Sequence, residues 1–159
     1  MSAQNKALVE DLYANIIAKG QIDRLRELVA PDCLDHGAAA MGWKDGFLDH
    51  VRWLRGILAD MVIQVTDMVA EDDRVVAYWT VVGTHQGDLA KTPPTGRKVT
   101  GTAISQLRFR DGKLVEYQVK ADFLSILQQI GAMPAWNPVT GFGSGATDVP
   151  ARSRSAPTA

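Results

Sequence analysis

The amino-acid sequence predicts an α+β domain in which helices pack on one side of a strongly curved antiparallel sheet. Up to Asp60 the apolar residues recur at the 3.6-residue period of helices. After Asp60 they alternate at the two-residue period of strands, and Asp111-Gly112 marks a hairpin turn. A curved sheet under a helical cover encloses a cone-shaped space, so this fold class also predicts a ligand pocket.

Three amphipathic helices are expected before the sheet. They cover residues 2–19, 22–29 and 43–61, where apolar side chains follow one another at steps of three and four. Gly20 ends the first helix as a left-handed cap would. A short strand at residues 33–37 runs into a loop of small residues before the third helix. These three helices are the predicted cover of the sheet.

Four or so antiparallel strands are expected to follow. Residues 74–84 form a β-branched and aromatic run that we expect to be buried on much of both faces. The loop at residues 84–98 is rich in turn residues and long enough to carry function or disorder. Strands at 99–109 and 114–121 make the hairpin, and residues 123–130 close the fold as a short helical or extended lid.

One domain is expected over residues 1–134, because a chain of 159 residues that is 46% hydrophobic can bury one sizeable core. The composition then shifts to Pro, Gly, Ser, Thr and Ala, which predicts a flexible tail over residues 135–159. No apolar run approaches the roughly 18 residues of a membrane span, and the amino end is charged rather than signal-like. We therefore expect a soluble, cytoplasmic protein with no membrane partner.

Charge and motif content argue against several classes of function. The chain has 17 basic and 18 acidic residues, so a nucleic-acid partner is not expected. Cys33 is the single cysteine, which excludes an intrachain disulfide, and the chain contains no phosphate loop, GxSxG, HExxH or CxxC motif. The histidines are widely spaced, so no metal site is expected. His50, beside Asp49 and Arg52 on a helix, is expected to face solvent.

Asp122 is the leading candidate for chemistry. It ends a strand in which Glu116, Gln118 and Lys120 alternate with apolar residues, and the sequence turns apolar directly after it. The polar face of this strand has two interpretations, because it either meets water or lines a pocket. In the second case the carboxylate is drawn toward the core, where burial would raise its pKa and make it a general acid or base.

The partner strand offers this carboxylate two alternative sets of neighbours. A strict two-residue turn would place Ser105 and Leu107 on its face of the sheet, whereas a bulged turn would place Gln106 and Arg108 there. The alternative to a site role for Arg108 is that its side chain lies at the protein surface. The register of the hairpin decides between them.

Aromatic and histidine side chains complete the candidate site. Tyr13, Trp53 and Trp79 are core residues by default, but a planar aromatic ligand would need such walls. His36 and His85 border loops, where polar side chains often serve a binding mouth. The candidate substrate-binding residues are therefore His36, Gln106, Arg108, Gln118, Trp53, Trp79, Tyr13 and His85.

Six ordered motifs between Asn5 and Pro134 carry a resemblance to a known family. They are Asp35-His36, Asp72-Asp73-Arg74-Val75-Val76, Gly83-Thr84-His85-x-Gly87, Pro93-Pro94-Thr95-Gly96-Arg97, Arg108-Phe109-x-Asp111-Gly112-Lys113-Leu114-Val115-Glu116 and Leu127-x-Gln129-Ile130-Gly131. In order and spacing they resemble the SnoaL-like polyketide cyclases, a branch of the nuclear-transport-factor-2-like superfamily.

This resemblance implies a cone-shaped α+β barrel, commonly a dimer or tetramer assembled through its sheet. It also implies cofactor-free aldol ring closure on anthracycline-type polyketide esters, with Asp122 removing the acidic proton and Gln106 and Arg108 assisting. We therefore expect an Asn at position 122 to abolish turnover. Many relatives have Trp where this chain has Gln118, which alters the pocket wall. Other members of the family are assigned to anthracycline hydroxylation, so the alternatives are hydroxylation and non-catalytic binding of an aromatic ligand.

Overall fold

The computed structural model describes residues 2–137 and 139–142. Its helices are α1 (Ser2–Asp11), which continues as the π-helical turn η1 (Leu12–Ile17), α2 (Ile22–Leu28), α3 (Ala38–Met41), α4 (Phe47–Ile57) and α5 (Phe123–Ile130). Its strands are β1 (Val29–Asp35), β2 (Leu58–Glu71), β3 (Arg74–His85), β4 (Lys98–Arg110), β5 (Lys113–Ala121), β6 (Trp136–Asn137) and β7 (Gly141–Phe142). Within these residues no helix is both long and apolar enough to cross a membrane.

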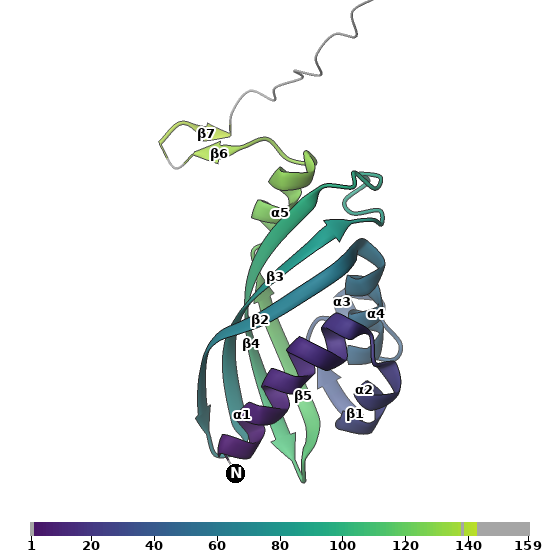
Figure 1. Ribbon diagram of the computed structural model, residues 1–159, viewed down its shortest axis with the longest axis vertical. Coiled ribbons are helices and arrows are strands. Elements are labelled where there is room, and N and C mark those ends of the chain that lie inside the picture. The colour runs from purple at the N-terminus through teal and green to yellow at the C-terminus, as the bar shows by residue number, and fades with distance from the viewer. Residues whose placement is uncertain (1, 138, 143–159) are drawn as a thin grey trace, which may run out of the picture.

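The first five strands form one sheet in the order β1-β5-β4-β3-β2 (Figure 1). Neighbouring strands from β5 to β2 pair antiparallel, whereas β1 pairs parallel with β5. The predicted α+β class is confirmed, but the sheet is mixed rather than wholly antiparallel. No hairpin joins β1 to β5, because the chain runs from β1 at one edge, through α3 and α4, to β2 at the other edge, so this pair need not be antiparallel.

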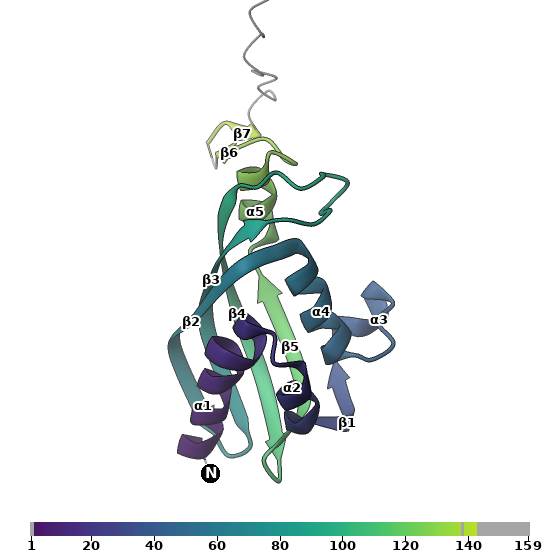
Figure 2. The same ribbon diagram turned by 45° about the vertical axis from the view of Figure 1, so that its right-hand side comes forward.

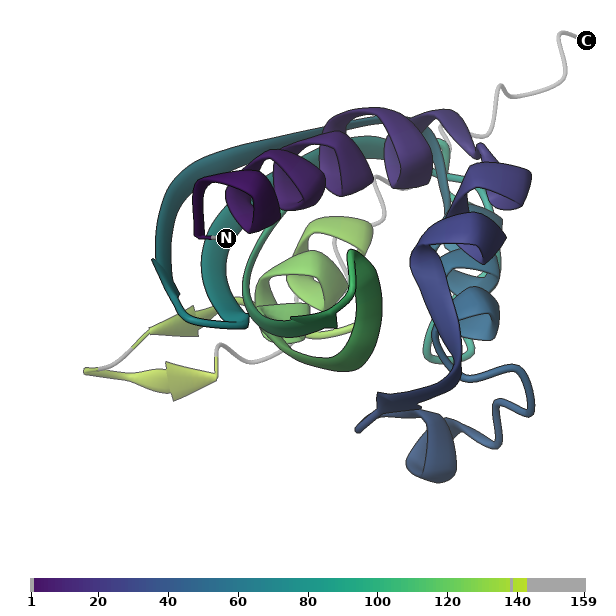
Figure 3. The same ribbon diagram turned by 90° about the horizontal axis from the view of Figure 1, so that it is seen from below.

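The helices α1, α2 and α4 lie on one side of the long strands (Figure 2). Viewed end-on, the sheet curls round, and α1 runs along its β2–β3 side (Figure 3). The helix α5 packs against β4 at the end of the sheet remote from the chain's amino terminus (Figure 1). The core therefore lies between the concave face of the sheet and these helices.

Strand β3 is buried on one face only, which corrects the prediction that both faces are buried. Val75 and Ala77 point into the core and are fully buried, whereas Val76 and Tyr78 are more than two-fifths exposed on the outer face. The reason is that the described helices cover only the concave face of the sheet. An apolar sequence on both faces of a strand therefore did not indicate two packed layers.

The hairpin between β4 and β5 turns at Asp111 and Gly112, whose φ angles of 52° and 73° suit a two-residue turn. The pairing register shifts between Arg108 and Phe109, because Val115 is inserted as a bulge next to the turn. The structure therefore has the bulged alternative rather than the strict register.

The third predicted helix is shorter than expected. Residues 43–61 were predicted as helix, but α4 ends at Ile57, and Leu58 already pairs with His85 in the sheet. The apolar residues from Leu58 to Met61 fit a helix or a strand, and pairing with β3 decides in favour of the strand.

The segment after α5 contains one small pair of strands. β6 and β7 are antiparallel, with Trp136 opposite Phe142. Residues 138 and 143–159, which belong to the predicted flexible tail, lie outside the described residues.

Candidate functional site

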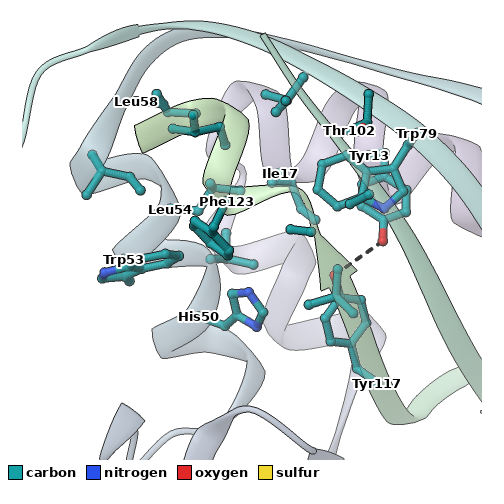
Figure 4. A pocket seen from close by; sticks show the side chains of 18 of the residues that line it. Tyr13, Ile17, His50, Trp53, Leu54, Leu58, Trp79, Thr102, Tyr117 and Phe123 are labelled. Atoms are coloured by element: carbon teal, nitrogen blue, oxygen red, sulfur yellow. Dashed lines mark hydrogen bonds between the residues drawn. The ribbon is translucent and has the colours of Figure 1, made fainter. Parts of the chain in front are cut away.

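A cavity lies between the concave face of the sheet and the helices (Figure 4). Side chains from η1, α4, the start of β2, β3, β4, β5 and the start of α5 form its wall, which is mostly apolar. It is narrow, with a free volume of about 50 Å³. The aromatic residues that line it are Tyr13, Phe47, Trp53, Trp79, Tyr117 and Phe123.

Strand β5 contributes its odd-numbered residues to this cavity. Tyr117, Val119 and Ala121 line the cavity, so the alternate residues Gln118 and Lys120 face away from it. Of the sequence's candidate binding residues, the structure brings Tyr13, Trp53 and Trp79 to the cavity wall.

A buried polar cluster forms part of the wall, centred on the hydroxyl of Ser105. This oxygen accepts hydrogen bonds from the Tyr13 hydroxyl at 2.6 Å and from the Trp79 indole N–H at 2.7 Å. The two bonds use both of its lone pairs, so its own hydrogen is directed to the Tyr117 hydroxyl at 3.3 Å. Tyr117 then keeps a hydrogen that can be donated to the Tyr13 oxygen, 3.4 Å away, or to a ligand.

The two tyrosines of this cluster are protonated donors. Burial raises the pKa of Tyr117 to about 12 and raises the pKa of Tyr13 well above its usual value. At neutral pH the cluster therefore presents hydroxyl groups rather than phenolates to the cavity.

A histidine–carboxylate pair lies beside the same cavity. His50, in the first turns of α4, lines the cavity, and its Nδ1 is 2.8 Å from an oxygen of Asp35 at the end of β1. Only 1% of the Asp35 side chain and 14% of the His50 side chain are exposed. The prediction that His50 faces solvent was wrong.

The sequence does contain a signal for this position of His50. Phe47, His50, Val51 and Leu54 stand at positions i, i+3, i+4 and i+7, the spacing of the buried face of a helix, and all four line the cavity. The charged neighbours Asp49 and Arg52 lie on the other side of α4. The helical period was therefore a better guide than the adjacent residues.

Five of the predicted binding residues do not line the cavity, and four of them are Gln106, Gln118, Arg108 and His36. The bulge pairs Gln106 with Gln118, but on the outer face of the sheet. Arg108 and His36 bond to the two carboxylate oxygens of Glu116 at 2.7 and 2.8 Å. The sequence pattern correctly placed these residues together on one face of the sheet. That face is the outer one, because the helices cover the other face.

The hydrogen bonds to Glu116 have an electrostatic consequence. The bond from His36 and then that from Arg108 hold the pKa of Glu116 below its usual value. About two-fifths of the His36 side chain is exposed, so this group of charges lies at the surface.

His85 is fully buried at the end of β3 but does not line the cavity. Its Nδ1 accepts a hydrogen bond from the Thr95 backbone N–H at 3.2 Å, which ties the loop after β3 to the strand. Its Nε2 has no hydrogen-bond partner within the described residues. Its position gives it no contact with the cavity that Tyr13, Trp53 and Trp79 line.

Asp122 is exposed, which corrects the expectation that the apolar sequence after it draws the carboxylate into the core. It is the N-cap of α5, and its side chain accepts a hydrogen bond from the Ser125 backbone N–H at 3.0 Å. The physical reason is that a free N–H group at a helix start attracts a carboxylate, and the apolar residues after it belong to the helix.

Residues 7–130 match the family of SnoaL-like polyketide cyclases. The chain belongs to this family. Its relatives include the nogalonic acid methyl ester cyclase of Streptomyces nogalater, which is 28% identical over 116 residues, or 70% of this chain and 87% of that protein. The predicted family and the prediction of an enzyme of this family are confirmed.

Solved structures of the same fold agree with this assignment. IdmH of Streptomyces antibioticus, a candidate polyketide cyclase, is 30% identical with a TM-score of 0.68, over 80% of this chain and 98% of that one. AclR of Streptomyces galilaeus, a candidate hydroxylase, is 26% identical with a TM-score of 0.74, over 87% of this chain and 88% of that one.

Proposed function

We propose that this protein closes a ring in an aromatic polyketide by aldol chemistry, with general acid/base catalysis and no cofactor. The observation that carries the proposal is the cavity wall of six aromatic side chains, because flat rings pack favourably against a fused aromatic substrate. The similarity to nogalonic acid methyl ester cyclase supports a polyketide methyl ester as the substrate.

In this proposal Asp122 is the base that removes the acidic proton of the substrate. Support comes from its chain neighbours Ala121 and Phe123, which both line the cavity, while the Asp122 side chain itself is exposed beside it. One carboxylate oxygen accepts from the Ser125 N–H, and the other can accept a proton from the substrate. The resemblance of the Asp122 region to the family supports the same role.

Entry of such a substrate requires side chains at the rim to move. A free volume of about 50 Å³ is well below the roughly 300 Å³ or more of ordinary ligand pockets. Phe123 packs on Trp53 with ring centroids 5.8 Å apart, and Phe123 is 38% exposed. This aromatic pair is therefore the part of the wall that we expect to open.

The proposal is tested by incubating the purified protein with nogalonic acid methyl ester in the absence of oxygen and reductant. The expected product has the mass of the substrate and a different chromatographic retention, because aldol ring closure is an isomerisation. Asp122→Asn is expected to lower turnover by at least about 100-fold. The variant should fold normally, because Asn caps helices about as well as Asp. Absence of conversion by the wild-type protein would contradict the function, and full activity of the variant would contradict the base.

Hydroxylation is the second candidate function, favoured by the similarity to AclR. It predicts oxygen uptake and a product heavier by one oxygen atom, with turnover only when a reductant is supplied. The same incubation, repeated in air with and without reductant, separates the two reactions.

Assembly of several copies through the sheet is part of the same proposal, since the resemblance implies it. Support comes from large apolar side chains exposed on the outer face of β2, β3 and β4, where water would otherwise meet them. They are Val62, Val69, Val76, Tyr78, Val82 and Ile104.

A further inference from the structure

We propose that His50 is a second catalytic residue of the cavity and that Asp35 is its positioning residue. The inference depends on the cyclase function proposed above and adds to it the group that gives a proton to the oxygen of the attacked carbonyl. Ring closure needs such a group, because the oxygen gains a negative charge inside a mostly apolar cavity.

The position of the His50 ring is determined from both sides. One oxygen of Asp35 accepts the Gly37 backbone N–H at 2.8 Å, and the other bonds to Nδ1 of His50 at 2.8 Å. The ring also packs against Trp43 and Tyr117, with centroids 4.5 and 5.5 Å away. A buried carboxylate held by a backbone N–H leaves the imidazole one favourable orientation.

This orientation leaves Nε2 of His50 for a ligand. A carboxylate oxygen only accepts, so the hydrogen between the two side chains is on Nδ1. Nε2 has no hydrogen-bond partner in the described part of the chain, and it is not sealed from solvent. Figure 4 shows the ring between Trp53 and Tyr117 on the wall of the cavity. His50 and Tyr117 both line the cavity, so an imidazole and a phenol hydroxyl are available to the same ligand.

The proton balance of the reaction assigns His50 its step. Asp122 takes the proton from the acidic carbon, and the resulting enolate carbon forms a bond to the carbonyl carbon. The π electron pair of that carbonyl moves to its oxygen, which takes the proton from Nε2 of the doubly protonated ring. The Asp35 carboxylate stabilises this imidazolium as an ion pair. Asp122 then releases its proton to solvent and His50 takes one back, so substrate and product have the same atoms.

The decisive variant is His50→Gln, which keeps a hydrogen-bonding side chain but cannot transfer a proton. With nogalonic acid methyl ester, kcat is expected to fall by at least about 100-fold, while KM changes by less than about threefold. In His50→Ala, added imidazole is expected to raise kcat at least about tenfold. A structural role alone would not produce such rescue.

The positioning role is tested with Asp35→Asn, which presents an N–H group to Nδ1 and so disfavours the doubly protonated ring that the step requires. It is expected to lower kcat by about 10-fold or more without changing KM. Arg52→Gln is the matched control, because Arg52 lies on the same helix and bonds to the carboxylate of Asp49 at 2.8 Å on the solvent side. The control is expected to keep wild-type kinetics, and all variants are checked for a wild-type circular dichroism spectrum.

The outcomes separate the two proposals. Full activity of His50→Gln together with an inactive Asp122→Asn overturns this inference and leaves the proposed function in place. If His50→Gln does lose kcat, the catalytic role is still overturned when imidazole does not rescue His50→Ala. It is also overturned when Arg52→Gln loses as much kcat as His50→Gln. A wild-type protein without activity overturns both proposals.

Discussion

Two neighbouring residues of β5, Glu116 and Tyr117, show how differently one strand uses its two faces. Glu116 lies on the outer face, where His36 and Arg108 bond to its carboxylate in partial contact with water. Tyr117 lies on the inner face, where it is 3% exposed and its hydroxyl belongs to a cluster that lines the cavity. The more polar side of the strand is therefore the side without the cavity.

This comparison teaches that polarity along a strand does not by itself identify a site. His36, Arg108 and Glu116 on the outer face are paired with one another and partly hydrated, so their chemistry is largely satisfied. The few polar atoms on the inner face are surrounded by apolar side chains, where a hydrogen bond to a ligand is stronger. Three expectations test this difference, from the largest effect to the smallest.

The first concerns the two tyrosines of the inner cluster. Tyr117→Phe is expected to lower kcat by about 10-fold or more, because it removes the hydroxyl hydrogen that is left for a ligand. Tyr13→Phe is expected to lower kcat less and stability more, by about 1 kcal/mol, because the Tyr13 hydroxyl is already used on Ser105. Steady-state kinetics and urea unfolding measure the two effects. The reverse order of the two kcat values would contradict this assignment of the hydrogens.

The second concerns the cap of α5. Asp122→Ala is expected to reduce the free energy of unfolding by about 1 kcal/mol, because it leaves the Ser125 N–H without its acceptor. Asp122→Asn keeps an acceptor and is expected to change the free energy of unfolding by only a few tenths of about 1 kcal/mol. Urea unfolding of both variants separates the cap from the proposed base. Equal destabilisation by the two substitutions would show that the charge, rather than the cap, stabilises the helix.

The third concerns the outer face. The pKa of Glu116 is lowered in the folded protein, so its ionised form contributes stability above the unfolded value near 4.5, and this is lost as the pH falls through the folded value. Glu116→Gln is therefore expected to destabilise the protein at pH 7 by at most about 1 kcal/mol. The difference from wild type should vanish in strong acid. Thermal unfolding between pH 7 and acid checks it, and a difference that grows on acidification would contradict the sign.

Much of the fold could be predicted from the sequence because its signals are local. The change of period after Asp60 separates helices from strands, and the Asp111-Gly112 turn marks the hairpin. The family motifs are local as well, and they led to the family that residues 7–130 match. The bulge at Val115 was one of two alternatives, because a turn sequence does not reveal whether the next residue is paired.

The site was only partly predictable because it depends on which face of the sheet the helices cover. Tyr13, Trp53 and Trp79 were selected for their aromatic rings, and packing alone brings such rings inside. Asp122 was expected in the core from the apolar residues after it, but those residues bury one face of α5 and leave its cap in water. His50 was judged by its charged neighbours although the helical period placed it inward.

The sequence by itself determined most of the helices and strands, the two alternating sets of residues on each strand and the family of the protein. Only the tertiary structure decided which set faces the cavity, because alternation is symmetrical until helices cover one face. It also decided the contact between Asp35 and His50, which come from the end of β1 and from α4. Their side chains meet because β1 pairs with β5 and α4 packs beside β1, and this is an arrangement that no local pattern contains.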